Sequence, residues 1–244
     1  DAGGHPGRVA DQAFGERVRA ADVAHGHGRI GLELSLGTQA SDRMAGEPTT
    51  FTHDWFHALG TDVVDATPLL ARVRALKTPQ ELERMRLANE IAAAAMDHCR
   101  AELRPRMKES EAGALWNGFV HGEGTGWKGQ VDLALAFSLV WSGPGIKTFT
   151  ATGDLPVQAD EPTLFEIWVC ADGYWCDHTK NVCPGTLEPR YDELLDALLG
   201  VYNRGLDHCR PGASLAELDR IIRTGITDAG LDERFPDRRL GAGD

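Results

Sequence analysis

The chain has 244 residues, of which 42% are hydrophobic and 25% are charged, which is typical of a globular protein with a sizeable core. The apolar runs are far shorter than a membrane span, which excludes a transmembrane class. The net charge of −12 disfavours nucleic acid and anionic membranes as partners, because both attract clustered cations. Five cysteines without CxxC spacing, and no signal-peptide pattern, indicate a reducing cytoplasm.

The first quarter of the chain alternates between helical and strand patterns. Residues 8–24 carry a weak helical stripe, which is followed by a strand-like run over 29–34. The same order repeats as a helix over 51–59 and a strand over 62–66. Helices that alternate with short strands predict an α/β layer in this part of the chain.

A helix start is predicted at Thr78. Thr78 and Glu81 have the spacing of a capping box, and Pro79 stands at the first helical position. The dipeptide Arg104-Pro105 ends the helix. Apolar residues recur on one side of it; they are Leu82, Met85, Ala92, Met96, Cys99 and Leu103.

After this helix the pattern changes from helical to β. A second helix is predicted over 109–121, and the three glycines of 122–126 predict a loop. A strand is expected over 131–141. Two runs rich in β-branched and aromatic residues, 163–170 and 174–182, flank a short Asp-Gly turn and predict a β-hairpin.

Two more helices are expected after the hairpin, over 190–207 and over 215–229. The second begins with another capping box, formed by Ser214 and Glu217. The chain begins at Asp1 and not at Met, and it stops without a helix-end or strand-end signal. We therefore expect a fragment of a longer protein whose sheet edges lack the strands that would follow.

Glu166 and Asp177 are the candidate site residues. Each interrupts an apolar or aromatic strand, and the two stand eleven positions apart on opposite arms of the hairpin. Residues so placed can lie across or diagonally from each other and share a cation. A solvated face of the hairpin, with no ligand, explains the same residues equally well. His178 points to the opposite face by strand alternation, which predicts a structural or surface role for it.

The sequence resembles the pita-bread metallopeptidases, a group that includes aminopeptidase P, prolidase, methionine aminopeptidase and creatinase. The run 173–181, with an acid eleven positions before Asp177, is similar to the metal-binding hairpin of that family. Segments 74–86, 108–111, 141–144 and 210–219 fit the same template in the same order.

The resemblance implies a mixed α/β (α+β) fold in two parts. Residues 1–73 would be the C-terminal part of a creatinase-type N-terminal domain. Residues 74–244 would be a pita-bread domain, incomplete at its C-terminus, with an antiparallel sheet and flanking helices. The implied activity is hydrolysis of the peptide bond beside proline by metal-activated water, with Mn²⁺, Co²⁺ or Zn²⁺ as the ion. The expected partner is a small peptide or small-molecule substrate, and a homodimer is compatible with the family.

The site departs from the family pattern at several positions. Asp177 matches the bridging Asp, whereas Glu166 replaces the first Asp and adds about 1.5 Å of reach. The family histidine that steadies the substrate should fall within 147–152, which contains none, and Ala242 stands in the place of the metal-binding histidine. Two further acidic ligands would lie beyond Asp244. We therefore expect the chain alone to hydrolyse no peptide.

Two other functions remain open at this stage. A metal-independent hydrolase or lyase like creatinase shares the fold and needs no metal ligands, but it needs the missing substrate histidine. A non-catalytic binding protein that keeps the pita-bread fold needs neither group.

Overall fold

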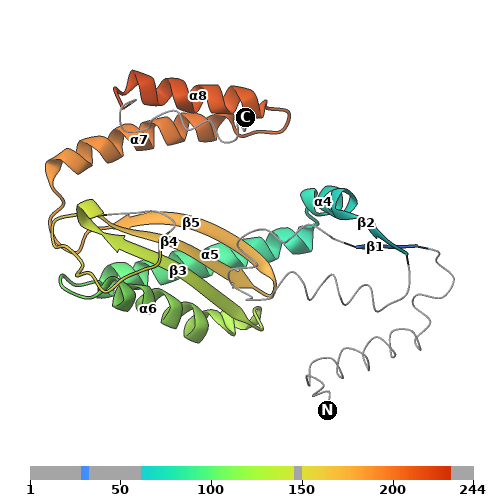
Figure 1. Cartoon of the computed structure of the whole chain (residues 1–244), viewed down its shortest axis with the longest axis horizontal. Coiled ribbons are helices and arrows are strands. Elements are labelled where there is room, and N and C mark those ends of the chain that lie inside the picture. The colour runs from blue at the N-terminus through green and yellow to red at the C-terminus, as the bar shows by residue number, and fades with distance from the viewer. Residues whose placement is uncertain (1–28, 33–61, 146–149, 232–244) are drawn as a thin grey trace, which may run out of the picture. The chain divides into compact units, whose positions relative to one another are not determined.

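The computed structural model (Figure 1) describes residues 29–32, 62–145 and 150–231. The helices predicted over 8–24 and 51–59 lie outside these residues. The described residues combine α-helices with an antiparallel sheet, which confirms the predicted α+β class. Among the helices described, none has the length and apolar character needed to cross a membrane.

Residue contacts divide the chain into two compact units, 1–87 and 88–244. The domain boundary predicted between residues 73 and 74 stays a prediction. In the first unit, strands β1 (Arg29–Leu32) and β2 (Asp62–Asp65) pair in parallel, which the long connection between them allows.

Helix α4 (Thr67–Ala75) follows β2 and was not expected from the sequence. Pro68 stands in its first turn, where a missing N–H costs nothing. The backbone N–H of Thr67 donates to Asp65 Oδ1 at 2.8 Å. Asp65 followed closely by Pro68 is therefore a helix-start signal in the sequence.

Helix α5 (Pro79–Glu102) begins where its capping box predicts. The Thr78 N–H donates to Glu81 Oε2 at 2.6 Å, and the Glu81 N–H donates to Thr78 Oγ1 at 3.3 Å. Of the predicted apolar side, Ala92, Met96 and Cys99 are buried, whereas Leu82 is 55% exposed, because the buried part of α5 begins at Leu87.

Helix α6 (Glu109–Phe119) continues into a π-helical turn, Val120–Gly124, where the sequence predicted a loop. The reason lies in the packing of Gly124. A Cβ there would stand 3.0 Å from Ala134 Cβ and 3.0 Å from Ile91 Cγ2. This glycine is therefore required for close approach between the turn, α5 and the sheet, and it does not mark an irregular segment.

Strands β3 (Ala134–Ser142), β4 (Thr163–Ala171) and β5 (Tyr174–Val182) form an antiparallel sheet in the order β3-β4-β5. The predicted hairpin is thus confirmed. Its two turn residues, Asp172 and Gly173, have φ values of 49° and 89°, as a type I′ turn requires.

One face of this sheet is covered by α5 and α6 (Figure 1). Ser138 Oγ on β3 donates to the Gly113 carbonyl of α6 at 3.4 Å, and the same glycine leaves only 3.2 Å for a Cβ. On β4, Phe165, Ile167 and Val169 are at most 1% exposed. The core of the unit therefore lies between this face and the two helices.

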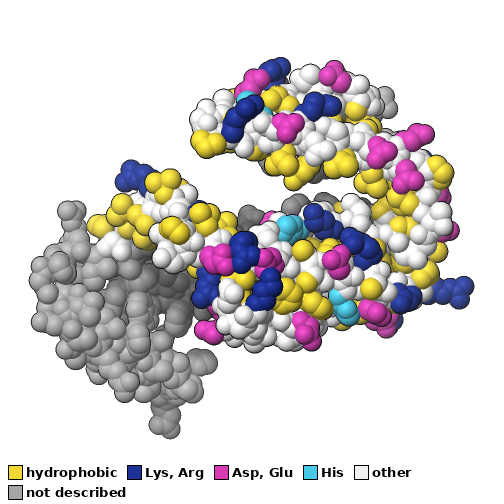
Figure 2. All heavy atoms as spheres, turned by 180° about the vertical axis from the view of Figure 1, so that it is seen from behind, with side chains coloured by type: hydrophobic (Ala, Val, Ile, Leu, Met, Phe, Trp, Pro, Cys, Tyr) yellow, Lys and Arg dark blue, Asp and Glu magenta, His cyan; other side chains and the backbone are white. Residues whose placement is uncertain are grey.

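Helices α7 (Pro189–His208) and α8 (Leu215–Asp228) form a hairpin close to the predicted bounds. Ser214 Oγ accepts the Glu217 N–H at 3.3 Å, which confirms the second cap. The helices approach closely because each carries a glycine at the contact: a Cβ on Gly205 would stand 2.5 Å from Ile222 Cδ1, and one on Gly225 would stand 3.1 Å from Val201 Cγ1. Hydrophobic side chains remain exposed along α7 (Figure 2); they include Leu195, Leu199, Tyr202 and Leu206.

Candidate functional site

Strand alternation gives the three-stranded sheet a second face, turned away from α5 and α6, which we call the outer face. From β3 it carries Leu135, Phe137, Leu139 and Trp141; from β4 Leu164, Glu166, Trp168 and Cys170; and from β5 Trp175, Asp177, Thr179 and Asn181. Leu135 is 41% exposed and Trp175 is 39% exposed, so solvent reaches this face.

Both candidate carboxylates lie on the outer face. Glu166 is directly opposite Thr179, and Asp177 is directly opposite Trp168. Because residues two positions apart on a strand share a face, Glu166 and Asp177 are diagonal neighbours. Glu166 is half-buried and Asp177 is exposed. The register therefore brings the two acids to one side of the sheet.

His178 lies on the inner face, as alternation predicts. Its Nε2 is 2.8 Å from Asn89 Oδ1, so it links the edge strand β5 to α5. Burial lowers the pKa of His178, the charge of Lys180 lowers it further, and the charge of Asp177 opposes both. The neutral imidazole is thus favoured in a linking role between sheet and helix.

The three cysteines near the hairpin differ in burial. Cys170 and Cys176 are buried, and Cys183 is half-buried. Burial raises the pKa of the Cys176 thiol to about 11 and also raises that of Cys170. Their thiolate forms are disfavoured at neutral pH, which argues against a nucleophilic role.

The segment after β3 was expected to hold a substrate histidine within 147–152, and 147–149 lie outside the described residues. Two threonines of this segment contact β3 by hydrogen bonds. The Val140 N–H donates to Thr152 Oγ1 at 2.8 Å, and Trp141 Nε1 donates to Thr150 Oγ1 at 3.0 Å. The expected ligand position Ala242 also lies outside the described residues.

A buried acid that sequence reasoning missed anchors the end of β3. Glu109 is 3% exposed, and its Oε1 accepts the Ser142 N–H at 2.8 Å. Ser142 Oγ lies 2.9 Å from Thr163 Oγ1 and accepts the Gln158 N–H at 2.9 Å. Glu109 stands in an acidic first helical turn, so nothing local distinguishes it from a solvated residue.

The sequence also did not reveal an aromatic pair on the outer face. Phe137 lies directly opposite Trp168, and their ring centroids are 5.1 Å apart with planes tilted by 42°. Trp168 is two positions from Glu166 and directly opposite Asp177. An apolar wall therefore stands beside the two carboxylates.

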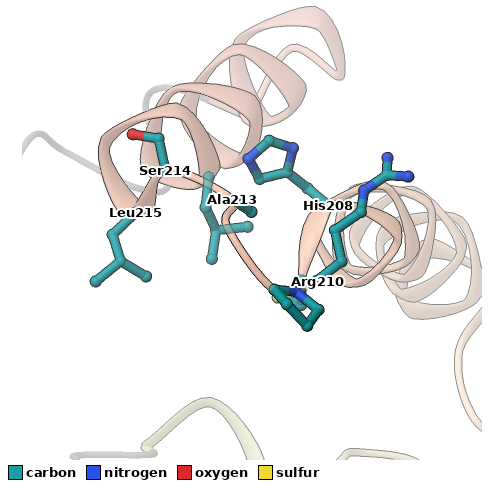
Figure 3. A pocket seen from close by; sticks show the side chains of 8 residues that line it. His208, Arg210, Ala213, Ser214 and Leu215 are labelled. Atoms are coloured by element: carbon teal, nitrogen blue, oxygen red, sulfur yellow. The ribbon is translucent and has the colours of Figure 1, made fainter.

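A pocket of about 370 Å³ lies at the turn between α7 and α8 (Figure 3). Its lining includes His208, Arg210 and Leu215, and the His208 ring lies toward the first turn of α8. His208 Nε2 is buried without a hydrogen-bond partner among the described residues. No lining residue belongs to the outer face, and we assign the pocket no role.

Comparison with known proteins relates most of the chain to one family. The model of metallopeptidase family M24 matches residues 83–243. The chain is 26% identical over 242 residues to a Xaa-Pro dipeptidase of Lactobacillus delbrueckii, which covers 94% of the chain and 62% of that protein. A peptidase of Staphylococcus saprophyticus is 35% identical over 91 residues, 37% of the chain and 26% of that protein.

Solved structures agree in fold. The X-Pro aminopeptidase from Thermotoga maritima matches with a TM-score of 0.66 at 18% identity, over 96% of this chain and 60% of that one. The prolidase from Pyrococcus furiosus gives 0.68 at 18% identity, over 91% and 60%. The predicted relation to the pita-bread fold is thus confirmed, and the chain spans less than two thirds of each of these proteins.

Proposed function

Because the chain belongs to metallopeptidase family M24, we propose that it forms part of a peptidase that cleaves the peptide bond next to proline. Relatives named Xaa-Pro dipeptidase and X-Pro aminopeptidase support this assignment. In the proposal, Glu166 and Asp177 hold a divalent metal ion, which is Mn²⁺, Co²⁺ or Zn²⁺. The substrate is a small peptide.

The observation that carries the proposal is the register of β4 and β5. It puts one carboxylate from each strand on the outer face, as diagonal neighbours. Diagonal neighbours have Cβ atoms about 7–8 Å apart. An Asp side chain, a Glu side chain and two metal–oxygen bonds together span up to about 10 Å, so one ion can contact both acids.

The donor set fits part of a metal shell. Carboxylate oxygens are accepted by all three ions. Within the described residues, no group of three or more His, Cys, Asp or Glu converges on one point. Glu166 and Asp177 therefore supply two ligands, and a complete shell needs donors besides these.

An ion bound there would supply an activated water and a Lewis acid for the scissile carbonyl. Glu166 and Asp177 would fix its position over β4 and β5. The apolar residues of β3 would limit the access of bulk water on the neighbouring side, which strengthens electrostatic interactions at the carboxylates.

Titration calorimetry with MnCl₂ tests the proposal. We expect Asp177→Asn and Glu166→Gln each to weaken Mn²⁺ binding about tenfold or more, because each removes a charged ligand but keeps the side-chain shape. The matched control is Asp196→Asn on α7, which removes the same charge from an exposed position away from the sheet. It should leave the affinity within about twofold.

Equal Mn²⁺ affinity in the chain and in Asp177→Asn would contradict the assignment. A chain that binds no Mn²⁺ at all would favour the metal-independent or non-catalytic alternatives.

A further inference from the structure

Two aromatic side chains, Phe137 and Trp168, lie on the outer face of the sheet and so outside the core between the inner face and helices α5 and α6. The inner face of β4 is filled by residues at most 1% exposed, whereas both aromatic rings are only half-buried. Large apolar side chains grouped on an accessible face mark a binding surface more often than a structural need. The position of these rings beside the carboxylates indicates what they bind.

Polarity divides the outer face across the sheet. All its β3 positions are apolar, and three of its four β5 positions are polar. None of its residues is Lys, Arg or His. Glu166 and Trp168 on β4 stand at the boundary between the two halves. A ligand on this face would thus place an apolar group over β3 and a polar group toward β5.

The contact between the Phe137 and Trp168 rings shows where the aromatic wall lies relative to the two carboxylates. Trp168 has Phe137 opposite it on β3 and Asp177 opposite it on β5. The ring centroids of Trp168 and Phe137 are 5.1 Å apart, so the two rings form one continuous apolar wall over β3 and β4. Asp177 lies on the other side of Trp168, so the wall and the acids occupy adjacent places.

We propose that Phe137 and Trp168 form the surface against which the prolyl ring of a peptide substrate lies, and that they determine its specificity. This inference rests on the proposed peptidase function. A prolyl ring is compact and apolar and has no N–H to satisfy, and aromatic surfaces accept such rings in known recognition modes. Residues Glu166 and Trp168 are about 7 Å apart along β4, which is the length of an extended dipeptide.

The spacing gives the substrate an orientation. With its prolyl ring on Trp168 and Phe137, a dipeptide along β4 brings its peptide carbonyl toward Glu166. The bulk of Trp168 would then select the residue after the scissile bond. A peptide with alanine in that place keeps the same backbone but loses the ring contact.

The test uses the whole chain in EDTA, so that the result does not depend on bound metal. Saturation-transfer NMR on ligand protons measures the dissociation constants of Gly-Pro and Gly-Ala. We expect Gly-Pro to bind about fivefold more tightly, the size of one aromatic contact. Phe137→Ala and Trp168→Ala should each remove that preference, and Trp168→Phe, which keeps an aromatic face, should retain most of it.

Leu164→Ala is the matched control, because Leu164 flanks Glu166 on the same face two positions before it, as Trp168 does two positions after it. It should change the Gly-Pro affinity less than twofold. Circular dichroism confirms the fold of each variant, and Phe137→Ala and Trp168→Phe decide the question if Trp168→Ala does not fold. Equal binding of the two dipeptides, or an equal loss in Leu164→Ala, would overturn the inference.

Calorimetry with MnCl₂ on the same variants, after the EDTA has been removed by dialysis, separates the two proposals. Phe137→Ala should keep the Mn²⁺ affinity within about twofold, because the ring supplies no ligand. A chain that prefers Gly-Pro but binds no Mn²⁺ would refute the metal assignment and support the proposed prolyl-binding surface. A chain that binds Mn²⁺ without preferring Gly-Pro would refute the surface alone.

Discussion

Replacement of Gly124 by Ala tests whether packing, and not flexibility, requires a glycine in the π-helical turn. The new Cβ would stand 3.0 Å from both Ala134 Cβ and Ile91 Cγ2, and both neighbours are fully buried. Overpacking of this kind costs about 1–3 kcal/mol. Ala also favours helical backbone over Gly by up to about 1 kcal/mol, which offsets part of that cost.

Gly122→Ala is the internal control, since the same turn leaves nothing within 4 Å of a Cβ at Gly122. It gains the helical preference without the clash. Urea unfolding followed by circular dichroism should therefore place Gly124→Ala about 1–3 kcal/mol below Gly122→Ala in stability. Equal stability of the two variants would refute the packing argument and restore the prediction of a loop at 122–126.

Further predictions concern protonation and local structure. The pKa of His178 is lower in the folded than in the unfolded chain, so its contribution to stability is present above about pH 6.5 and is lost as the pH falls below it. Unfolding measured in EDTA from pH 7.5 to 5 should show a loss of stability that His178→Asn reduces; an unchanged pH dependence would contradict the burial of the imidazole as the cause of its lowered pKa. Iodoacetamide should modify exposed Cys209 before buried Cys99, whose pKa burial raises to about 12, and mass spectrometry that finds Cys99 modified first would refute this order. Ser214→Ala should destabilise α8 by about 1 kcal/mol, and an unchanged urea midpoint would exclude a capping role for its hydroxyl.

Features encoded within a few residues could be predicted from the sequence. The cap of α5 at Thr78 and the Asp172-Gly173 turn were found because their partners are sequence neighbours. The shared face of Glu166 and Asp177 followed from alternation around that turn. Elements of this kind account for the predicted hairpin and for the predicted starts of α5 and α8.

Features that depend on distant partners could not be predicted. The sequence predicted a loop at Gly124, whereas a glycine is required there by close contact with Ala134 and Ile91, which only the fold brings near. The aromatic wall depends on the register that pairs Phe137 with Trp168. The register of two strands joined by a long connection cannot be read from their local sequence. Burial of Glu109 likewise requires Ser142, thirty-three positions away.

The stoichiometry of Mn²⁺ binding tests most directly the central claim that Glu166 and Asp177 hold one metal ion. A shared ion gives one bound Mn²⁺ per chain, whereas two separate weak sites give two. If Glu166 and Asp177 hold one ion between them, calorimetry on the chain gives one site, whose affinity either Glu166→Gln or Asp177→Asn lowers about tenfold or more. The double variant keeps neither carboxylate and lowers the affinity of that one site further. Two sites in the chain, lost one at a time by the two substitutions, would contradict the shared site.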